Sequence, residues 1–265
     1  MACCYMTARG QTEERGIPVE YTYDLHLHSC LSPCGDEEMT PANLVNMAAL
    51  LGLDIIALTD HNTVGNCRSA MEAGERAGVL VIPGMELCTA EEIHVICLFP
   101  TLQHAEDFSA EVYQNLPPIR NRPGIYGRQL RMDSADGILG EEPLLLVTAS
   151  GISIDHVSEL VARYGGLCYP AHIDRPSFSV LANFGVYPEH LPFPVAEISR
   201  HANPHTLRAD HPELARMPFV RASDAHRLED MMEPEDGQVM ELPERTAAAV
   251  LNWLQTRKSS GNPAL

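Results

Sequence analysis

Short apolar runs alternate with amphipathic stretches along the first hundred residues. Four apolar runs predict buried strands: 21–27, 54–59, 79–83 and 93–99. Residues 40–51 and 64–77 instead repeat apolar residues at helical spacing, and Thr40 is predicted to cap the first of these helices. Glycines directly follow both stretches, Gly52 and Gly78, and predict helix C-termini there. The alternation of strands and helices predicts a parallel sheet with both faces covered, either open or closed into a barrel.

The second half of the chain resumes this pattern after an interruption. Residues 100–150 are rich in proline, glycine and charge, and we expect an inserted segment there that has room for a small hairpin or helix. A helix is predicted over 154–164, capped by Ser153, and a last amphipathic helix over 243–255. Three more short strands are predicted, at 167–170, 195–198 and 219–222.

We expect one large domain with short extensions. The predicted divisions are a polar lead-in over 1–20, a catalytic domain over 21–258 and a tail over 259–265. The chain has no apolar run of about 18 residues, so no membrane span is expected, and its first residues lack the layout of a secretory signal. The 8 cysteines are irregularly spaced without a Cys-x-x-Cys pair, which is typical of free thiols in a reducing compartment. These features predict a cytoplasmic protein.

The charge balance excludes several function classes. Acidic residues outnumber basic ones by 36 to 18, for a formal charge of −18. Binding of DNA or RNA beyond short oligonucleotides is therefore disfavoured, because it needs clustered cations. The sole lysine is Lys258, beside the predicted tail. A Walker-type phosphate loop, a Schiff-base enzyme and a carbamylated-lysine metal centre all need a lysine in the site, so all three are disfavoured.

Imidazoles and carboxylates gather where the predicted strands end. Active sites of barrels and open parallel sheets form at that edge. Side chains at positions i and i+2 of a strand lie on the same face. His26 and His28 can therefore bind one metal ion together, and Asp224 and His226 have the same spacing. Further candidates lie at or near other strand ends: Asp60, His61, Glu86, His94, His172 and Glu197. The sequence predicts a site for several metal ions.

These residues resemble the PHP (polymerase and histidinol phosphatase) metallo-phosphoesterases. The matching pieces occur in the family's order: Asp24-Leu25-His26-Leu27-His28-Ser29, Leu58-Thr59-Asp60-His61-Asn62-Thr63, Pro83-Gly84-Met85-Glu86, His94-Val95, Pro170-Ala171-His172 and Ser223-Asp224-Ala225-His226. They span residues 21–228. The resemblance implies an α/β fold, a distorted (β/α)7 TIM-like barrel with an insertion around 100–150. It also implies two or three Zn²⁺, Mn²⁺ or Fe ions at the C-terminal rim.

The resemblance further implies how the ligands divide among the ions. One ion would be held by His26, His28, Glu86 and Asp224, a second by Glu86, His94 and His172, and a third by His61 and His226. Asp60 would orient a ligating histidine rather than bind metal. Five or six residues after His28 the family usually supplies another histidine or aspartate, whereas this chain has Pro33 and Cys34 there, followed by Asp36. Three alternatives remain for that ligand position: Cys34 binds as a thiolate, Asp36 binds instead, or neither residue binds metal.

The chemistry expected of this set is hydrolysis of a phosphate ester. Divalent ions lower the pKa of bound water from about 15.7 toward about 7, and the resulting metal-bound hydroxide would attack phosphorus. Asp224 is therefore expected to be catalytic as well as a ligand. Arg175 and Arg200 are the candidates to clamp the phosphate. His201, beside Arg200, is the candidate acid that protonates the leaving group.

The leading prediction is a metal-dependent phosphatase that acts on a small phosphorylated metabolite, such as a nucleotide or histidinol phosphate. One alternative is an amidohydrolase-type enzyme that cleaves C–N or ester bonds, since such enzymes also place His-x-His after the first strand. A second is a nuclease or proofreading-type PHP module, and a third is a metal-binding module without activity. No membrane partner is expected, and the sequence leaves the oligomeric state open.

Overall fold

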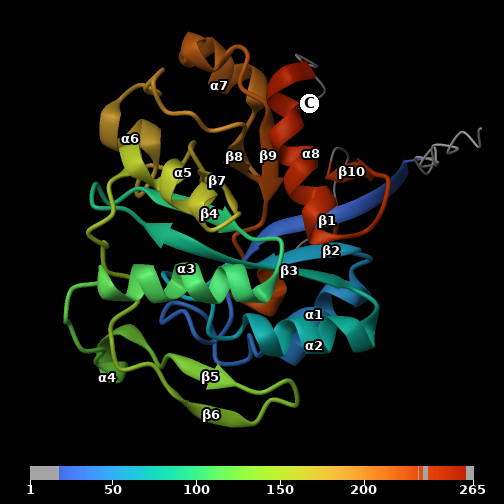
Figure 1. Ribbon diagram of the computed structural model, residues 1–265, viewed down its shortest axis with the longest axis vertical. Coiled ribbons are helices and arrows are strands. Elements are labelled where there is room, and N and C mark those ends of the chain that lie inside the picture. The colour runs from blue at the N-terminus through green and yellow to red at the C-terminus, as the bar shows by residue number, and fades with distance from the viewer. Residues whose placement is uncertain (1–17, 232, 235–237, 261–265) are drawn as a thin grey trace, which may run out of the picture.

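The computed structural model describes residues 18–231, 233–234 and 238–260, and Figure 1 shows an α/β fold around a curled sheet. The main sheet has the strand order β10-β1-β2-β3-β4-β7. Its strands are Val19–Leu27 (β1), Ile55–Leu58 (β2), Leu80–Cys88 (β3), His94–Leu98 (β4), Leu167–Pro170 (β7) and Val239–Leu242 (β10). Two smaller sheets pair Leu130–Met132 (β5) with Ile138–Glu141 (β6), and Ala196–Ser199 (β8) with Phe219–Ala222 (β9).

Helices of several lengths connect these strands. They are Pro41–Leu50 (α1), Cys67–Ala77 (α2), Leu102–Gln114 (α3), Pro123–Tyr126 (α4), Ile154–Arg163 (α5), Val180–Phe184 (α6), Pro204–Asp210 (α7) and Ala247–Ser260 (α8), with short 3-10 turns at Pro212–Leu214 and Leu228–Asp230. Two predicted caps are confirmed. The Thr40 side chain accepts a hydrogen bond from the Asn43 N–H at 3.2 Å, and the Ser153 hydroxyl accepts one from the Asp155 N–H at 3.3 Å. Gly78 ends α2 with a φ of 77°.

The main sheet is mixed, so the prediction of an all-parallel sheet is wrong. Strands β1, β2 and β3 run parallel, whereas β4 is antiparallel to both β3 and β7. Only five residues, 89–93, join β3 to β4, and a connection that short can form a hairpin but not a parallel crossover. The reversal places His94, at the start of β4, opposite Cys88 at the end of β3. His94 therefore lies at the same edge as the ends of the parallel strands.

The small β8–β9 sheet lies between the two ends of the curled main sheet. Beside β7, the Ile173 N–H donates to the Glu197 carbonyl at 2.9 Å. Beside β1, the Asp224 N–H donates to the His26 carbonyl at 3.1 Å. These contacts bring the ends of strands far apart in sequence to one rim. The predicted α/β class is confirmed, and the sheet has the curl of a half-barrel.

Alternate residues of the strands enter two separate cores, as the two-residue period of a strand requires. In β2, Ile56 and Leu58 pack in the core that holds the buried faces of α1, α2, α3 and α5. Ile55 and Ala57 pack in the second core, together with Leu254 of α8. Both faces of the sheet are therefore covered, as predicted from the apolar runs.

Residues 100–150 match the predicted insertion only in part. The α3 helix belongs to the main core, where Ala105, Phe108 and Val112 are fully buried. Their helical spacing is obscured in the sequence by the prolines and glycines that follow. Beyond α3 the chain leaves the main sheet and forms the β5–β6 hairpin at the lower edge of Figure 1. The prediction allowed a small hairpin or a small helix in this region, and the structure has one of each: the β5–β6 hairpin and α4.

The ends of the chain are described only in part. Residues 1–17 of the predicted lead-in and 261–265 of the predicted tail lie outside the described residues. The α8 helix continues to Ser260, so it passes the predicted start of the tail at Ser259. Among the described helices, none combines the length and apolar character needed to cross a bilayer.

Candidate metal centre

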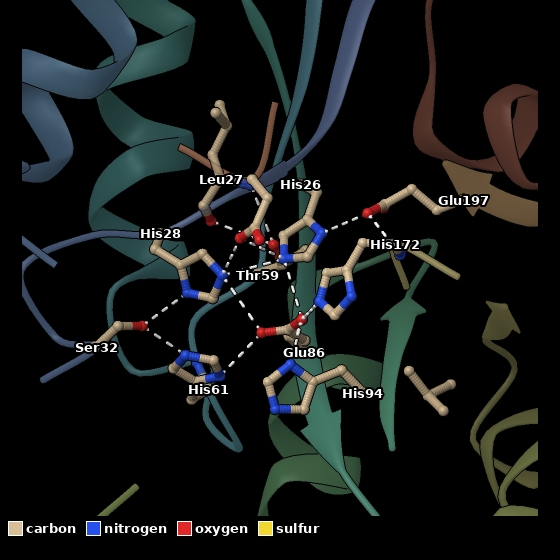
Figure 2. Close-up of polar contacts among 12 residues, drawn as sticks. His26, Leu27, His28, Ser32, Thr59, His61, Glu86, His94, His172 and Glu197 are labelled. Atoms are coloured by element: carbon tan, nitrogen blue, oxygen red, sulfur yellow. Dashed lines mark hydrogen bonds and ion pairs between the residues drawn. The ribbon is translucent and has the colours of Figure 1, made fainter. Parts of the chain in front are cut away.

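The eight predicted metal ligands meet at one rim of the curled sheet. Seven are buried, and His226 is half-buried. Figure 2 shows six of them pointing toward one another: His26, His28, His61, Glu86, His94 and His172. They come from the end of β1, the end of β3, the start of β4 and the loops after β2 and β7. Asp224 and His226 follow β9.

Glu86 occupies the middle of this cluster. Its Oε1 lies 2.8 Å from His94 Nδ1, 3.0 Å from His172 Nε2 and 3.3 Å from His26 Nε2. Its Oε2 lies 2.9 Å from His61 Nδ1. Strand β3 runs past its predicted end at residue 83, so Glu86 is fixed inside a strand rather than in a loop. A carboxylate with imidazoles from different elements at both oxygens is suited to bridge two cations.

Asp224 joins the cluster from the far end of the chain. Its Oδ1 lies 3.1 Å from the Nε2 atoms of both His26 and His28. Those two nitrogens are themselves 3.0 Å apart, so the His-x-His pair faces one side, as the strand geometry predicts. Two imidazole nitrogens and a carboxylate oxygen therefore surround one small volume.

The tautomer of His28 is set by a chain of two hydrogen bonds. The Ser32 hydroxyl donates its proton to Asp60 Oδ1 at 2.7 Å. Ser32 Oγ, which lies 2.9 Å from His28 Nδ1, can then only accept a hydrogen bond from that nitrogen. With a proton on Nδ1, Nε2, which faces Asp224, is the nitrogen that would coordinate a cation. Asp60 thus orients a predicted ligand through a serine, in keeping with its expected supporting role.

Glu197 fixes the tautomer of His26 in the same way. Its Oε1 accepts a hydrogen bond from His26 Nδ1 at 2.9 Å and another from the His172 N–H at 3.1 Å. From its place in a predicted strand, Glu197 was one of the candidates at the rim, without a specific role. A carboxylate inside an otherwise apolar strand is the signal that marks it, because buried charges need specific partners.

We predict that Glu197→Gln weakens metal binding by about 10- to 100-fold, because the amide cannot stabilise the Nδ1–H tautomer of His26 as a carboxylate does. Metal affinity measured by competition with a chromophoric chelator checks this prediction. Glu241→Gln, at an exposed position of β10, is the matched control. Unchanged affinity in Glu197→Gln would contradict the assigned role.

The electrostatics of the cluster favour cations. Burial alone would lower the pKa of His28 and of His61, but Glu86 acts on both and Asp224 on His28, and the pKa of each rises to about 9. Burial alone would raise the pKa of Glu86, but His94 and the other imidazoles hold it well below its usual range. The carboxylates therefore hold positive charge at this rim, whether protons or metal ions carry it.

Several buried atoms of the cluster face one another at ion-pair distance without forming a regular hydrogen bond with any described residue: His61 Nδ1, His94 Nδ1, Glu86 Oε2 and Asp224 Oδ1. A buried polar atom without a well-formed hydrogen bond costs about 1–3 kcal/mol. Imidazole nitrogens and carboxylate oxygens are ligands that transition metals accept, so coordination would satisfy these atoms. Three sets keep their ligand atoms within 4.8 Å of one another: His26, His28 and Glu86; His61, Glu86 and His94; and His28, His61 and His226. The residues fit divalent metal ions.

Backbone strain collects at the same rim. His172 has a φ of 25°, and Phe178 and Asp224 each have a φ of 53°. Asn62, next to His61, has a φ of 52°. Residues other than glycine seldom adopt such values, which cost about 1–3 kcal/mol each and are found preferentially at functional sites. This strain is independent support for a functional rim.

A cavity of about 150 Å³ lies against the cluster and is lined by His61, Glu86, His94, His172, Arg175, Ser177, Phe178, Asp224 and His226. Arg175, a predicted phosphate ligand, has Nη1 at 2.5 Å from Asp224 Oδ2. Its side chain is 41% exposed. A guanidinium that is both tethered to the cluster and open to solvent is well placed to meet an incoming anion.

Arg200 and His201 lie in a neighbouring cavity of about 370 Å³, which Arg175 and Asp224 also line. The Arg200 Nε–H donates to His201 Nε2 at 3.1 Å. Neither Arg200 nor His201 lines the cavity of about 150 Å³ beside the histidine cluster. Their expected roles in binding phosphate and in protonating the leaving group therefore stay predictions.

The position left open after His28 has one candidate in contact with the cluster. Cys34 Sγ lies 3.2 Å from His61 Nε2. Asp36 is exposed, and its Oδ1 accepts a hydrogen bond from the Glu38 N–H at 2.9 Å. The geometry therefore favours Cys34 over Asp36 as an additional ligand.

Comparison with known proteins decides the family. The PHP domain profile matches residues 24–185, which is more than half of the chain. The chain belongs to the PHP domain family. The resemblance predicted from the six motifs is confirmed, and it places the chain in a family of metal-dependent phosphoesterases.

Individual relatives match the chain over shorter stretches. A 5′-3′ exoribonuclease of Haemophilus influenzae is 37% identical over 79 residues, which cover 29% of this chain and 28% of the relative. A phosphoribosyl 1,2-cyclic phosphate 1,2-diphosphodiesterase of Eggerthella lenta is 34% identical over 80 residues, covering 28% and 29%. The matches thus span less than a third of these curated relatives.

The fold itself is shared more widely. A lesion-specific endonuclease of Pyrococcus furiosus has a similar structure, with a TM-score of 0.64 at 17% identity. The match covers 89% of this chain and 56% of the endonuclease. At this identity the likeness concerns the fold alone.

Proposed function

We propose that this PHP protein is a phosphatase that hydrolyses a small phosphomonoester, such as a nucleotide. The observation that carries the proposal is the buried ring of imidazoles around Glu86, with the Arg175 guanidinium at its edge. The adjacent cavity has a volume of about 150 Å³. A space of that size suits a terminal phosphate better than the interior of a long polymer.

The ligand set would hold two or three divalent ions, of Zn, Mn or Fe. His26, His28, Glu86 and Asp224 would bind one, Glu86, His94 and His172 a second, and His61 and His226 a third. When bound, such ions supply a water molecule of lowered pKa as the nucleophile and neutralise charge on the phosphoryl oxygens.

The side chains of this protein would position and stabilise the substrate. The Arg175 guanidinium, now paired with Asp224, would turn one edge toward the phosphate and bind it through charge-assisted hydrogen bonds. Asp224 is catalytic in this proposal, because it positions Arg175 and also contacts His26 and His28. The leaving oxygen would face the neighbouring cavity, where Arg200 would contact the substrate and His201 would donate the proton that this oxygen needs.

The architecture that supports this site is inferred to be a distorted (β/α)7 barrel over residues 21–258. Strands β1, β2, β3, β4, β7, β8 and β9 would form its wall, supported by the contacts that connect β8 and β9 to the main sheet. A cytoplasmic location stays a prediction from the sequence.

Nucleic acid ends are the second candidate substrate. The names of two similar proteins, an exoribonuclease and an endonuclease, count against the expectation that DNA and RNA are disfavoured. The formal charge of −18 still opposes binding along a long polyanion. We therefore restrict this alternative to short oligonucleotides whose end enters the cavity.

A substrate panel in the presence of Mn²⁺ tests the proposal. It combines nucleoside monophosphates, histidinol phosphate, p-nitrophenyl phosphate, a short labelled RNA, and amide and lactone substrates. We expect phosphate release from a monoester, and a loss of about 10³-fold or more in kcat for both His26→Ala and Asp224→Asn. His104→Ala, at an exposed position of α3, is the control. Turnover at the wild-type rate in both variants, or cleavage of amides alone, would refute the proposal.

A further inference from the structure

Phe178 is the one hydrophobic side chain among the described residues that line the metal-site cavity. It lies in the loop between β7 and α6, and 43% of its surface is exposed. The His94 ring covers one side of it, with ring centroids 4.8 Å apart and planes 20° apart. The rest of the phenyl surface is therefore open to solvent beside the predicted metal ligands.

The loop holds Phe178 in place against its own backbone preference. Its φ of 53° is rare for a bulky residue, and two ligands of the same site, His172 and Asp224, share a positive φ. The Phe178 carbonyl accepts a hydrogen bond from the His94 N–H at 2.9 Å. A strained conformation fixed by hydrogen bonding beside a candidate active site points to a use for the side chain.

Arg175 and Phe178 belong to one braced loop. The Ser179 hydroxyl donates to the Arg175 carbonyl at 2.7 Å and accepts from the Ala182 N–H at 3.1 Å, where it caps α6. The same short segment therefore presents a guanidinium and an aromatic ring to one cavity. A ligand with a phosphate and a flat ring a few bonds away would meet both.

We propose that Phe178 stacks against the base of a nucleotide whose phosphate lies at the metal centre. The inference rests on the proposed function and deepens it, because it selects nucleotides over sugar and alkyl phosphates. Stacking suits this position, because every base has a π-face and an exposed ring beside a polar cavity gains contact area when a base covers it. Replacing the stacking aromatic residue is expected to weaken recognition of a base by about 10- to 100-fold.

The test compares substrates that differ by the base. Steady-state kinetics in Mn²⁺ would be measured for adenosine 5′- and 3′-monophosphate and for ribose 5-phosphate, with wild type, Phe178→Leu and Phe178→Trp. We expect Phe178→Leu to raise KM for the better adenosine monophosphate by about 10- to 100-fold while KM for ribose 5-phosphate changes by less than about threefold. Phe178→Trp should keep the preference for adenosine monophosphate. Phe184→Leu, on α6 and 42% exposed outside the cavity, is the matched control.

Two outcomes would overturn the inference. An equal loss on adenosine and ribose phosphates in Phe178→Leu would mean that the ring only supports His94, and a wild type without preference for the base would mean that no base is bound. Calorimetric measurement of adenosine monophosphate binding to the Mn²⁺-loaded protein tests base stacking on Phe178 separately from phosphatase activity. Affinity that depends on Phe178 without any hydrolysis would refute the phosphatase and keep the stacking site.

Discussion

Replacing Glu86 with glutamine is expected to lower kcat/KM by about 10³-fold or more and to remove most of the bound metal, with little change in fold. Glu86 is the carboxylate whose two oxygens face imidazoles from different elements, including His61 on one side and His94 and His172 on the other. Glutamine keeps the volume but loses the charge. A loss of several kcal/mol of transition-state stabilisation corresponds to a rate reduction of about this size.

The expected loss is checked by steady-state kinetics together with elemental analysis of the purified variant. Glu106→Gln is the control, because Glu106 forms an exposed ion pair with Arg68 away from the rim. Circular dichroism establishes that the variant is folded. A folded Glu86→Gln protein with wild-type metal content and activity would show that the cluster is not a metal centre.

Removing metal from the wild-type protein is expected to abolish hydrolysis and to lower Tm by about 5–10 °C. A ligand at about 100 times its Kd stabilises the folded state by about 2.7 kcal/mol per site. In a chain of this size, 1 kcal/mol corresponds to roughly 2–4 °C. Without a metal ion, only protonated imidazoles such as His26 would balance the negative charges of Glu86 and Asp224.

Thermal unfolding after exhaustive chelation, and again after return of Mn²⁺ or Zn²⁺, measures this effect. The Glu86→Gln variant provides the comparison, since it should show little response to added metal. Full activity in chelated protein, or an identical Tm with and without metal, would contradict a structural and catalytic role for the ions.

The local features of the sequence predicted most of the secondary structure. The caps at Thr40 and Ser153 and the end of α2 at Gly78 are where the residue types placed them. These signals are local, because a cap or a left-handed glycine acts within one turn of the chain. The α3 helix, by contrast, was hidden by the proline- and glycine-rich segment beyond it.

The set of candidate metal ligands was predictable for a related reason. In His-x-His and Asp-x-His, the two-residue spacing by itself directs both side chains to the same face of a strand. The edge of the sheet then brings such pairs together. Glu197 and Phe178 carry no such spacing. Their contacts with His26 and His94 join residues 171 and 84 positions apart, respectively, and no local pattern reports such distances.

The sequence by itself determined the type and order of most elements, the family and the set of candidate ligands. These follow from side-chain periodicity and from short spacings, which are properties of neighbouring residues. Only the tertiary structure decided that β4 runs antiparallel, that β8 and β9 lie between the ends of the sheet, and that a strained phenyl ring lines the cavity at the site. Each of these features depends on which segments distant in the sequence pack together. The packing energy comes from contacts between residues whose proximity the sequence alone does not reveal.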